Sequence, residues 1–509
     1  METKTAAIEM RNITKRFGPV LANDKVWLNI YRGEILALLG ENGSGKTTLM
    51  NMLSGIYFPD EGEIKIDGKE VVIRSPKDAF DNGIGMIHQH FKLVDVLTAA
   101  ENIVLGLPGK LDLKAASAKI REICDKYGFS VDPTQKIYDM SVSQKQTVEI
   151  VKVLYRGADI LILDEPTAVL TPQETDKLFA VLRNMRNDGK AIVIITHKMH
   201  EVEALSDRVA ILRHGQFIGD MLTKDTNAQE MTNMMVGHAV SLNIDRPDPV
   251  DPKPRVEVKG LTVRSVDGII KLDDVSFTAN SGEILGIAGI SGCGQKELLE
   301  AIAGLQTVES GSISYIEDDG SREELIGKDP LSIAELGVSL SFVPEDRLGM
   351  GLVGNMNLAD NMMLRSFRRG KSIFTDRRSP RALAESVVQE LSVSTPSVDT
   401  PVRRLSGGNV QKVLVGREIA IAPTVLLTAY AVRGLDIHSS YTIYDLINRQ
   451  KKAGVAVIFV GEDLDVLLEL CDRILVLCGG KVSGIVPGRG AEKREVGMMM
   501  TKLGGQSHE

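Results

Sequence analysis

Short apolar runs that end in polar residues are the most regular feature of this sequence. They occur at 34–39, 85–91, 160–166 and 191–195. Each apolar run has the length and the continuous hydrophobic character of a strand buried in a parallel sheet. Apolar residues at helical spacing follow, most clearly over 113–127 and 147–154. The pattern predicts an α/β fold in which strands and helices alternate.

A glycine-rich segment follows the first apolar run. Residues 40–48 match the phosphate-binding pattern G-x-x-x-x-G-K-[ST] in full. Glycines let several backbone N–H groups turn toward phosphates without Cβ clashes. Lys46 would bring a positive charge to the β- and γ-phosphates, and Thr47 would offer a hydroxyl to Mg²⁺ where a helix begins. The segment predicts a nucleotide site built from Gly40, Glu41, Asn42, Gly43, Ser44, Gly45, Lys46, Thr47 and Thr48.

Two later runs end in residues that suit phosphate chemistry. Asp164 and Glu165 end one run, and His197 follows another. Because sites in open α/β sheets lie at the carboxyl ends of the strands, these side chains should face the glycine-rich loop. One carboxylate can hold Mg²⁺ through water, and the second can orient or deprotonate an attacking water. Gln89, at the polar end of its own run, is a further candidate.

A proline-rich segment divides the chain. Residues 241–254 contain four prolines and no periodicity, which predicts a semi-stiff linker. Beyond it the motifs repeat: Gly289 stands 249 residues after Gly40, and Ala429 stands 265 residues after Asp164. The repeat predicts duplicated domains with a modest insertion in the second. The predicted order is a domain over 1–240, the linker over 241–254 and a second domain over 255–509.

Composition restricts the classes of function. The chain is 43% hydrophobic and 25% charged, as in ordinary globular proteins. Its net charge of -8 argues against a strongly basic nucleic-acid binder, although a local basic patch stays open. The N-terminus lacks an apolar signal core, and no run of about eighteen apolar residues occurs. We therefore expect a chain that is neither exported nor membrane-spanning.

Taken together, these motifs resemble those of ATP-binding cassette proteins over essentially the whole chain. The resemblance identifies Gln89 as the Q-loop, Glu165 as the catalytic glutamate and His197 as the switch histidine. It implies ATP and Mg²⁺ as cofactors, with Phe17 stacked on adenine. The metal ligands it implies are Thr47, Gln89 and Asp164. It also implies two tandem domains, each with a mostly parallel core sheet, an antiparallel β part and a helical subdomain.

In that family an ATP lies between the P-loop of one domain and the signature motif of the other. The segment 405–409 resembles an intact signature, whereas 140–144 has Ser143 where a glycine belongs. The intact signature implies γ-phosphate contacts from Ser406, Gly407, Gly408 and Asn409. The second domain departs from the family pattern at Gln295, Lys296, Glu345, Ala429, Tyr430 and Glu462. We therefore predict one competent composite ATP site per chain, the other binding nucleotide weakly or serving as a scaffold.

Such asymmetry in a tandem chain resembles the ATPase subunits of bacterial importers for simple sugars and nucleosides. Residues 89–106 and 154–174 look most like the nucleoside type, whose binding proteins are basic membrane lipoproteins. The segments 91–106 and 348–363 are apolar enough to form grooves for two transmembrane permease subunits, or simply to pack a helical subdomain. The resemblance implies a peripheral place on the cytoplasmic face of the membrane, an indirect lipoprotein partner and no nucleic acid.

Three alternatives stay open. The transported solute can be a pentose or hexose sugar. A soluble tandem cassette protein acting on ribosomes or DNA is disfavoured, because the linker is short and not basic and no zinc-ligand cluster is present. A scaffold without turnover is disfavoured because the first site has every catalytic motif.

Overall fold

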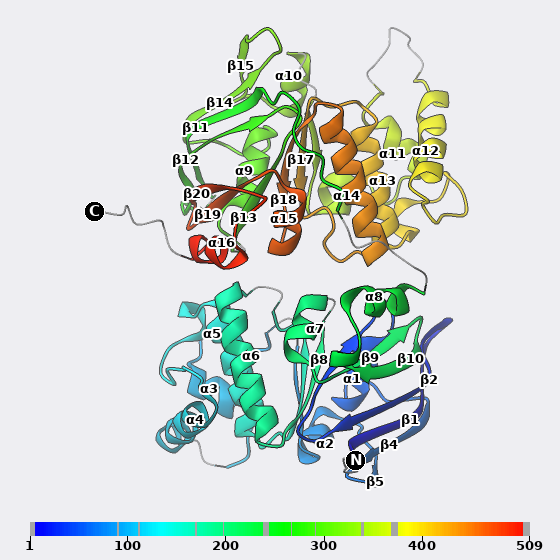
Figure 1. The fold of residues 1–509 in the computed structure, drawn as a ribbon, viewed down its shortest axis with the longest axis vertical. Coiled ribbons are helices and arrows are strands. Elements are labelled where there is room, and N and C mark those ends of the chain that lie inside the picture. The colour runs from blue at the N-terminus through cyan, green and yellow to red at the C-terminus, as the bar shows by residue number, and fades with distance from the viewer. Residues whose placement is uncertain are drawn as a thin grey trace. The chain divides into compact units, whose positions relative to one another are not determined.

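The chain forms two compact units, Met1–Ser241 and Leu242–Glu509, each described by itself (Figure 1). They come from a computed structural model. It describes residues 6–88, 91–109, 112–167, 170–196, 198–237, 244–265, 267–290, 292–336, 340–367 and 375–501.

The centre of unit 1 is a six-stranded sheet in the order β10-β9-β3-β8-β7-β6. Its strands are β3 (Ile35–Leu39), β6 (Ile84–Ile87), β7 (Ile160–Asp164), β8 (Ala191–Ile195), β9 (Arg208–Arg213) and β10 (Gln216–Leu222). All neighbours are parallel except β9 and β10. Every residue of β3 and β8 is buried. The strands predicted from the apolar runs are therefore confirmed.

A second, antiparallel sheet in unit 1 has the order β2-β1-β4-β5. Its strands are β1 (Ala6–Phe17), β2 (Val20–Tyr31), β4 (Glu61–Ile66) and β5 (Lys69–Val71). One apolar cluster joins this sheet to helix α1 (Lys46–Leu53) and to the central sheet. The cluster fixes the base of α1, so the glycine-rich loop that precedes this helix rests on two sheets.

The helices of unit 1 include a separate subdomain with its own apolar cluster. It contains α3 (Ala99–Val104), α4 (Leu113–Tyr127) and α5 (Val142–Tyr155), whereas α2 (Pro76–Asp81), α6 (Pro172–Asn187), α7 (Met199–Leu205) and α8 (Ala228–Val236) lie outside it. Helix α4 matches the prediction over 113–127. Helix α5 begins before the predicted 147–154, because Ser141 and Gln144 form a capping box at its start.

Unit 2 repeats this architecture, with sheets in the orders β16-β17-β18-β13-β19-β20 and β12-β11-β14-β15. Its strands are β11 (Pro254–Arg264), β12 (Ile270–Asn280), β13 (Ile284–Gly289), β14 (Ser310–Ile316), β15 (Arg322–Glu324), β16 (Leu340–Val343), β17 (Val425–Ala429), β18 (Ala456–Val460), β19 (Arg473–Cys478) and β20 (Lys481–Pro487). Its helices are α9 (Gln295–Ile302), α10 (Pro330–Glu335), α11 (Leu358–Met363), α12 (Arg378–Glu390), α13 (Gly407–Ile419), α14 (Ile437–Lys452), α15 (Leu464–Leu470) and α16 (Lys493–Met499). The predicted tandem α/β fold is confirmed. Within the described ranges, no helix combines the length and apolar content needed to cross a membrane.

The described part of the proline-rich segment packs against unit 2. Ile244 belongs to the apolar core of that unit. Arg246 is buried and donates to two backbone carbonyls of the unit. Lys451, only 2% exposed, donates to the carbonyl of Pro247 and, at 2.6 Å, to Oδ1 of Asp472. These contacts make residues 244–248 part of the second unit's packing.

We expect Lys451→Met to lower the free energy of unfolding of unit 2 by about 3 kcal/mol, because it leaves the buried carboxylate of Asp472 without its cation. Arg186→Met is the matched control. It removes the equivalent ion pair with Asp207 in unit 1, whose side chains are 28% and 34% exposed, and should cost less than about 1 kcal/mol. Hydrogen exchange read peptide by peptide in urea measures both losses, and equal losses would contradict the burial argument.

Candidate nucleotide site

The glycine-rich loop joins β3 to α1 through backbone conformations that suit glycine. Gly40, Gly43 and Gly45 have φ angles of 154°, 83° and 94°. A Cβ on Gly40 would lie 2.3 Å from the carbonyl oxygen of Leu212, and one on Gly45 would lie 2.4 Å from that of Ala22. Glycine is therefore required at both ends of the loop by close approach as well as by φ.

Lys46 lies inside this loop. Its side-chain Nζ donates to the carbonyl oxygens of Gly40 at 2.7 Å and Glu41 at 2.9 Å, and the residue is 8% exposed. Burial lowers the pKa of Lys46, and the negative charges of Glu165 and Asp164 oppose that shift. The ammonium is held by neutral oxygens, which anionic phosphate oxygens can replace with a stronger interaction.

Asp164 and Glu165 lie at the carboxyl end of β7, as predicted. Oδ2 of Asp164 is 3.5 Å from Oγ1 of Thr47 at the start of α1. Glu165 follows with a left-handed φ of 47°, and its backbone N–H donates to the carbonyl of Ile195 at 2.9 Å. Burial and the charge of Glu165 raise the pKa of Asp164 to about 6, although Lys46 acts in the opposite direction. Two carboxylates therefore share one lysine, and the site has excess negative charge.

The other predicted residues of unit 1 divide into two groups. Glu41, Asn42, Ser44 and Thr48 lie in or directly after the loop. The Phe17 ring is 42% exposed and packs edge-to-face on Tyr57, with ring centroids 5.1 Å apart. Gln89 and His197 lie outside the described residues.

Glu201 on α7 is a site-supporting residue that the sequence reasoning missed. It is buried, and its carboxylate accepts hydrogen bonds from Thr167 and Thr196. Lys198 Nζ lies 3.2 Å from the same carboxylate. Glu201 thus ties the segment after Glu165 to the end of β8. An acidic residue on the buried face of a short helix is the signal that could have identified it.

The predicted signature, residues 406–409, forms the start of α13 in unit 2. Oγ of Ser406 accepts from the backbone N–H of Asn409 at 3.4 Å and from its Nδ2 at 2.9 Å. The first N–H groups of a helix have no partner within the helix and favour an anion. Gly407 and Gly408 add no side chain there, so the N-terminus of α13 can approach a phosphate closely.

Gly292 and Gly294 of the second P-loop have φ angles of 87° and 97°, close to those of Gly43 and Gly45, but this loop lacks the charges of the first. Gln295 takes the place of the lysine, and its Nε2 donates to the carbonyl of Ile290 at 3.1 Å. Lys296, in place of the metal-binding hydroxyl, lies 3.7 Å from Glu300. Tyr430 stands at the catalytic-glutamate position with a φ of 52°, close to the value at Glu165.

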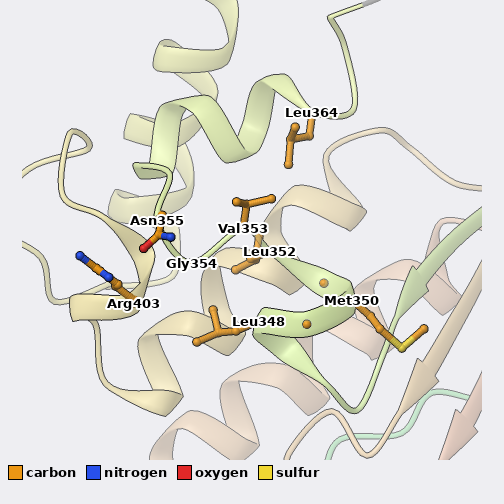
Figure 2. Close-up of a pocket in the computed structure, with 10 residues that line it drawn as sticks. Leu348, Met350, Leu352, Val353, Gly354, Asn355, Leu364 and Arg403 are labelled. Carbon is orange, nitrogen blue, oxygen red and sulfur yellow. The ribbon is translucent and has the colours of Figure 1, made fainter.

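The segments that follow the Q-loop positions carry exposed apolar side chains in both units. In unit 2 a groove of about 470 Å³ has Leu348, Leu352, Val353, Leu364 and Arg403 among its lining residues (Figure 2). In unit 1, Val94 and Val96 are exposed. A buried asparagine holds the backbone of each segment. Asn361 accepts a hydrogen bond from the N–H of Val353 and donates one to its C=O, and Asn102 makes the same two bonds with Val94.

Comparison with known proteins gives full-length relatives. The nucleoside import ATP-binding protein NupA of Lactococcus lactis subsp. cremoris is 43% identical, over 99% of each chain. The guanosine import ATP-binding protein NupO of Bacillus subtilis is 40% identical, over 97% of each chain. The glucose import ATP-binding protein of Haloferax volcanii is 40% identical, over 98% of this chain and 96% of its own.

The family comparison agrees with the repeated architecture. The sequence model for ABC transporters matches residues 23–168 and 272–428, one segment in each unit and together more than half of the chain. Each matched segment includes a glycine-rich loop; the first extends past Asp164 at the end of β7, and the second stops at residue 428, one residue before the end of β17. The chain therefore belongs to the ABC transporter family and carries two of its ATP-binding domains in tandem.

Proposed function

We propose that this chain hydrolyses ATP to power a bacterial importer, and that the imported solutes are nucleosides. The observation that carries the proposal is the meeting of Lys46, Asp164 and Glu165 at one sheet edge of unit 1. Full-length relatives named for nucleoside and guanosine import support the choice of solute. Relatives named for glucose and ribose import make sugars the second candidate.

The residues at this edge fit Mg²⁺. Thr47 and Asp164 present a hydroxyl and a carboxylate 3.5 Å apart, and burial, followed by the charge of Glu165, raises the pKa of Asp164 although Lys46 lowers it. Proteins hold Mg²⁺ with one or two such ligands and complete its shell with substrate phosphates and water. We propose Thr47, Asp164 and Gln89 as its ligands. The ion would neutralise charge on the β- and γ-phosphates.

We propose the following roles for the chain's own groups. Lys46 exchanges its loop carbonyls for phosphate oxygens, and the loop N–H groups bind the remaining ones. Glu165 orients the water that attacks the γ-phosphorus and accepts its proton as the bond to the leaving ADP oxygen breaks. His197 contacts the γ-phosphate, and Phe17 stacks on adenine. The signature residues 406–409 contact the γ-phosphate with the N-terminus of α13.

One competent ATP site per chain is part of this proposal. The charged groups that hydrolysis needs are present in unit 1, and the equivalent positions of unit 2 are Gln295, Lys296, Ala429 and Tyr430. An intact signature occurs in unit 2 alone. If each P-loop pairs with the signature of the other domain, the altered P-loop of unit 2 and the altered signature of unit 1 belong to the same composite site.

We also propose that the segments 91–106 and 348–363 bind two transmembrane permease subunits at the cytoplasmic face of the membrane. The apolar groove along 348–355 and the exposed valines of unit 1 support this role. A substrate-binding lipoprotein would act through the permease without touching this chain.

Glu165→Gln should retain ATP binding and lower turnover at least about 100-fold, because an amide cannot accept the proton of the attacking water. Tyr430→Phe alters the equivalent position of unit 2 and should leave turnover unchanged. Phosphate release and nucleotide binding by the full chain with its membrane partners measure both. Hydrolysis by Glu165→Gln near the parent rate would assign the base to another residue.

The pKa of Asp164 predicts a pH dependence of stability. Because the folded-state pKa is raised to about 6, ionising Asp164 costs free energy in the nucleotide-free fold but little in the unfolded chain. The parent should therefore lose stability as the pH rises from about 4 to about 6. Asp164→Asn cannot ionise, so it should lie within about 0.5 kcal/mol of the parent near pH 4 and exceed it by about 3 kcal/mol near pH 8. Urea unfolding without nucleotide measures this difference, and an advantage independent of pH would contradict the assignment.

Cells whose only copy carries Lys46→Ala should lose uptake of labelled nucleosides and keep uptake of labelled pentoses. The lysine is needed to bind ATP, so the transporter would lack its energy source. Loss of pentose uptake alone would make the protein a sugar importer. Unchanged uptake of both solutes would reject the importer assignment.

A further inference from the structure

In unit 2, the three positions that correspond to the Q-loop glutamine, the catalytic glutamate and the switch histidine face one guanidinium group. They are Glu345, Tyr430 and Glu462, and the guanidinium belongs to Arg433. Arg433 Nη1 donates to Oε1 of Glu345, and its Nε lies 2.9 Å from Oε1 of Glu462. Its central carbon lies 5.9 Å from the centroid of the Tyr430 ring.

The positions come from the carboxyl ends of three neighbouring strands, β16, β17 and β18. Arg433 lies in the turn after β17, where its backbone N–H donates to the carbonyl of Tyr430 at 3.0 Å. Its own carbonyl accepts a hydrogen bond from the side chain of Arg347. The turn therefore fixes the backbone of Arg433, and the two acidic side chains fix its guanidinium.

The second site does not fit Mg²⁺. Lys296 replaces the hydroxyl and Ala429 replaces the carboxylate that would bind the ion in unit 1. The carboxylates at the neighbouring strand ends are those of Glu345 and Glu462, and both are paired with Arg433. Burial, together with these two carboxylates, raises the pKa of Tyr430 to about 12, so this side chain is neutral at physiological pH.

Each site has two carboxylates and one basic side chain, but the contacts of the basic side chain differ. In unit 1, Lys46 Nζ donates to the loop carbonyls of Gly40 and Glu41, which leaves the strand-end carboxylates open to a further cation. In unit 2, two carboxylates face a guanidinium, whose planar fork can donate to both. Arg433 is 52% exposed at its side chain, so these pairs contribute little to stability. Their effect is on occupancy, because a fixed positive charge repels a divalent ion from the same place.

We propose that Arg433 is the built-in cation of the second site and that it keeps unit 2 free of divalent metal. Glu345 and Glu462 hold the guanidinium where the strand ends of unit 1 would face Mg²⁺. The inference rests on the proposed function only in assigning a metal to unit 1.

The test counts Mn²⁺ bound by the full chain. A Glu165→Gln parent is incubated with ATP and Mn²⁺ and separated from free ligand, and its bound Mn²⁺ is measured by electron paramagnetic resonance. We expect one ion per chain. Arg433→Ala on this background removes the guanidinium that contacts both carboxylates and should bind a second ion, whereas Arg433→Lys keeps the charge and should still bind one. Adding Glu345→Gln to Arg433→Ala should remove the second ion.

Two ions in the parent, or no gain in a folded Arg433→Ala chain, would overturn the inference. Near-UV circular dichroism shows whether the variant is folded. The proposed function can fail separately: a parent without bound Mn²⁺ would reject the metal site of unit 1, and a single ion gained on Arg433→Ala would still support the role of Arg433.

Discussion

The nucleotide edge of unit 1 depends on like charges held together at the ends of parallel strands. Strand β7 ends beside β8 and near the P-loop helix, so Asp164 and Glu165 are fixed close to each other and to Lys46. Burial increases the cost of this arrangement, as the raised pKa of Asp164 indicates. A fold that accepts this cost without a ligand is prepared to bind a cation together with an anionic phosphate chain.

The two domains differ in the positive charge that accompanies the carboxylates at their strand ends. In unit 1, Lys46 is held by loop carbonyls, and we propose that the strand-end carboxylates take a cation from solution. In unit 2, Lys296, Ala429 and Tyr430 stand at the corresponding positions, and Arg433 contacts the carboxylates of Glu345 and Glu462 directly. The proposed asymmetry therefore concerns the source of the positive charge as well as the residues at the catalytic positions.

Local patterns predicted much of this fold, and contacts between distant residues explain what was missed. Apolar runs located β3, β7 and β8, because a strand buried on both faces must be hydrophobic throughout. Glycine spacing located the P-loop, because the backbone conformations of this loop depend on residues within the loop itself. Burial of Arg246 was not predictable, because its partners lie more than two hundred residues away. Nor could spacing show that Glu201 would bridge two strand ends or that Arg433 would face two acidic residues.

The left-handed turn after β17 has a consequence for how catalytic strain should be interpreted. Tyr430 has nearly the φ of Glu165, and its N–H donates to Val460 just as that of Glu165 donates to Ile195. A non-glycine residue in this region costs on the order of 1 kcal/mol. Unit 2 accepts this cost although it has a tyrosine where unit 1 has Glu165. The strained turn therefore belongs to the sheet's architecture, and in this chain a positive φ after the strand does not by itself mark a catalytic residue.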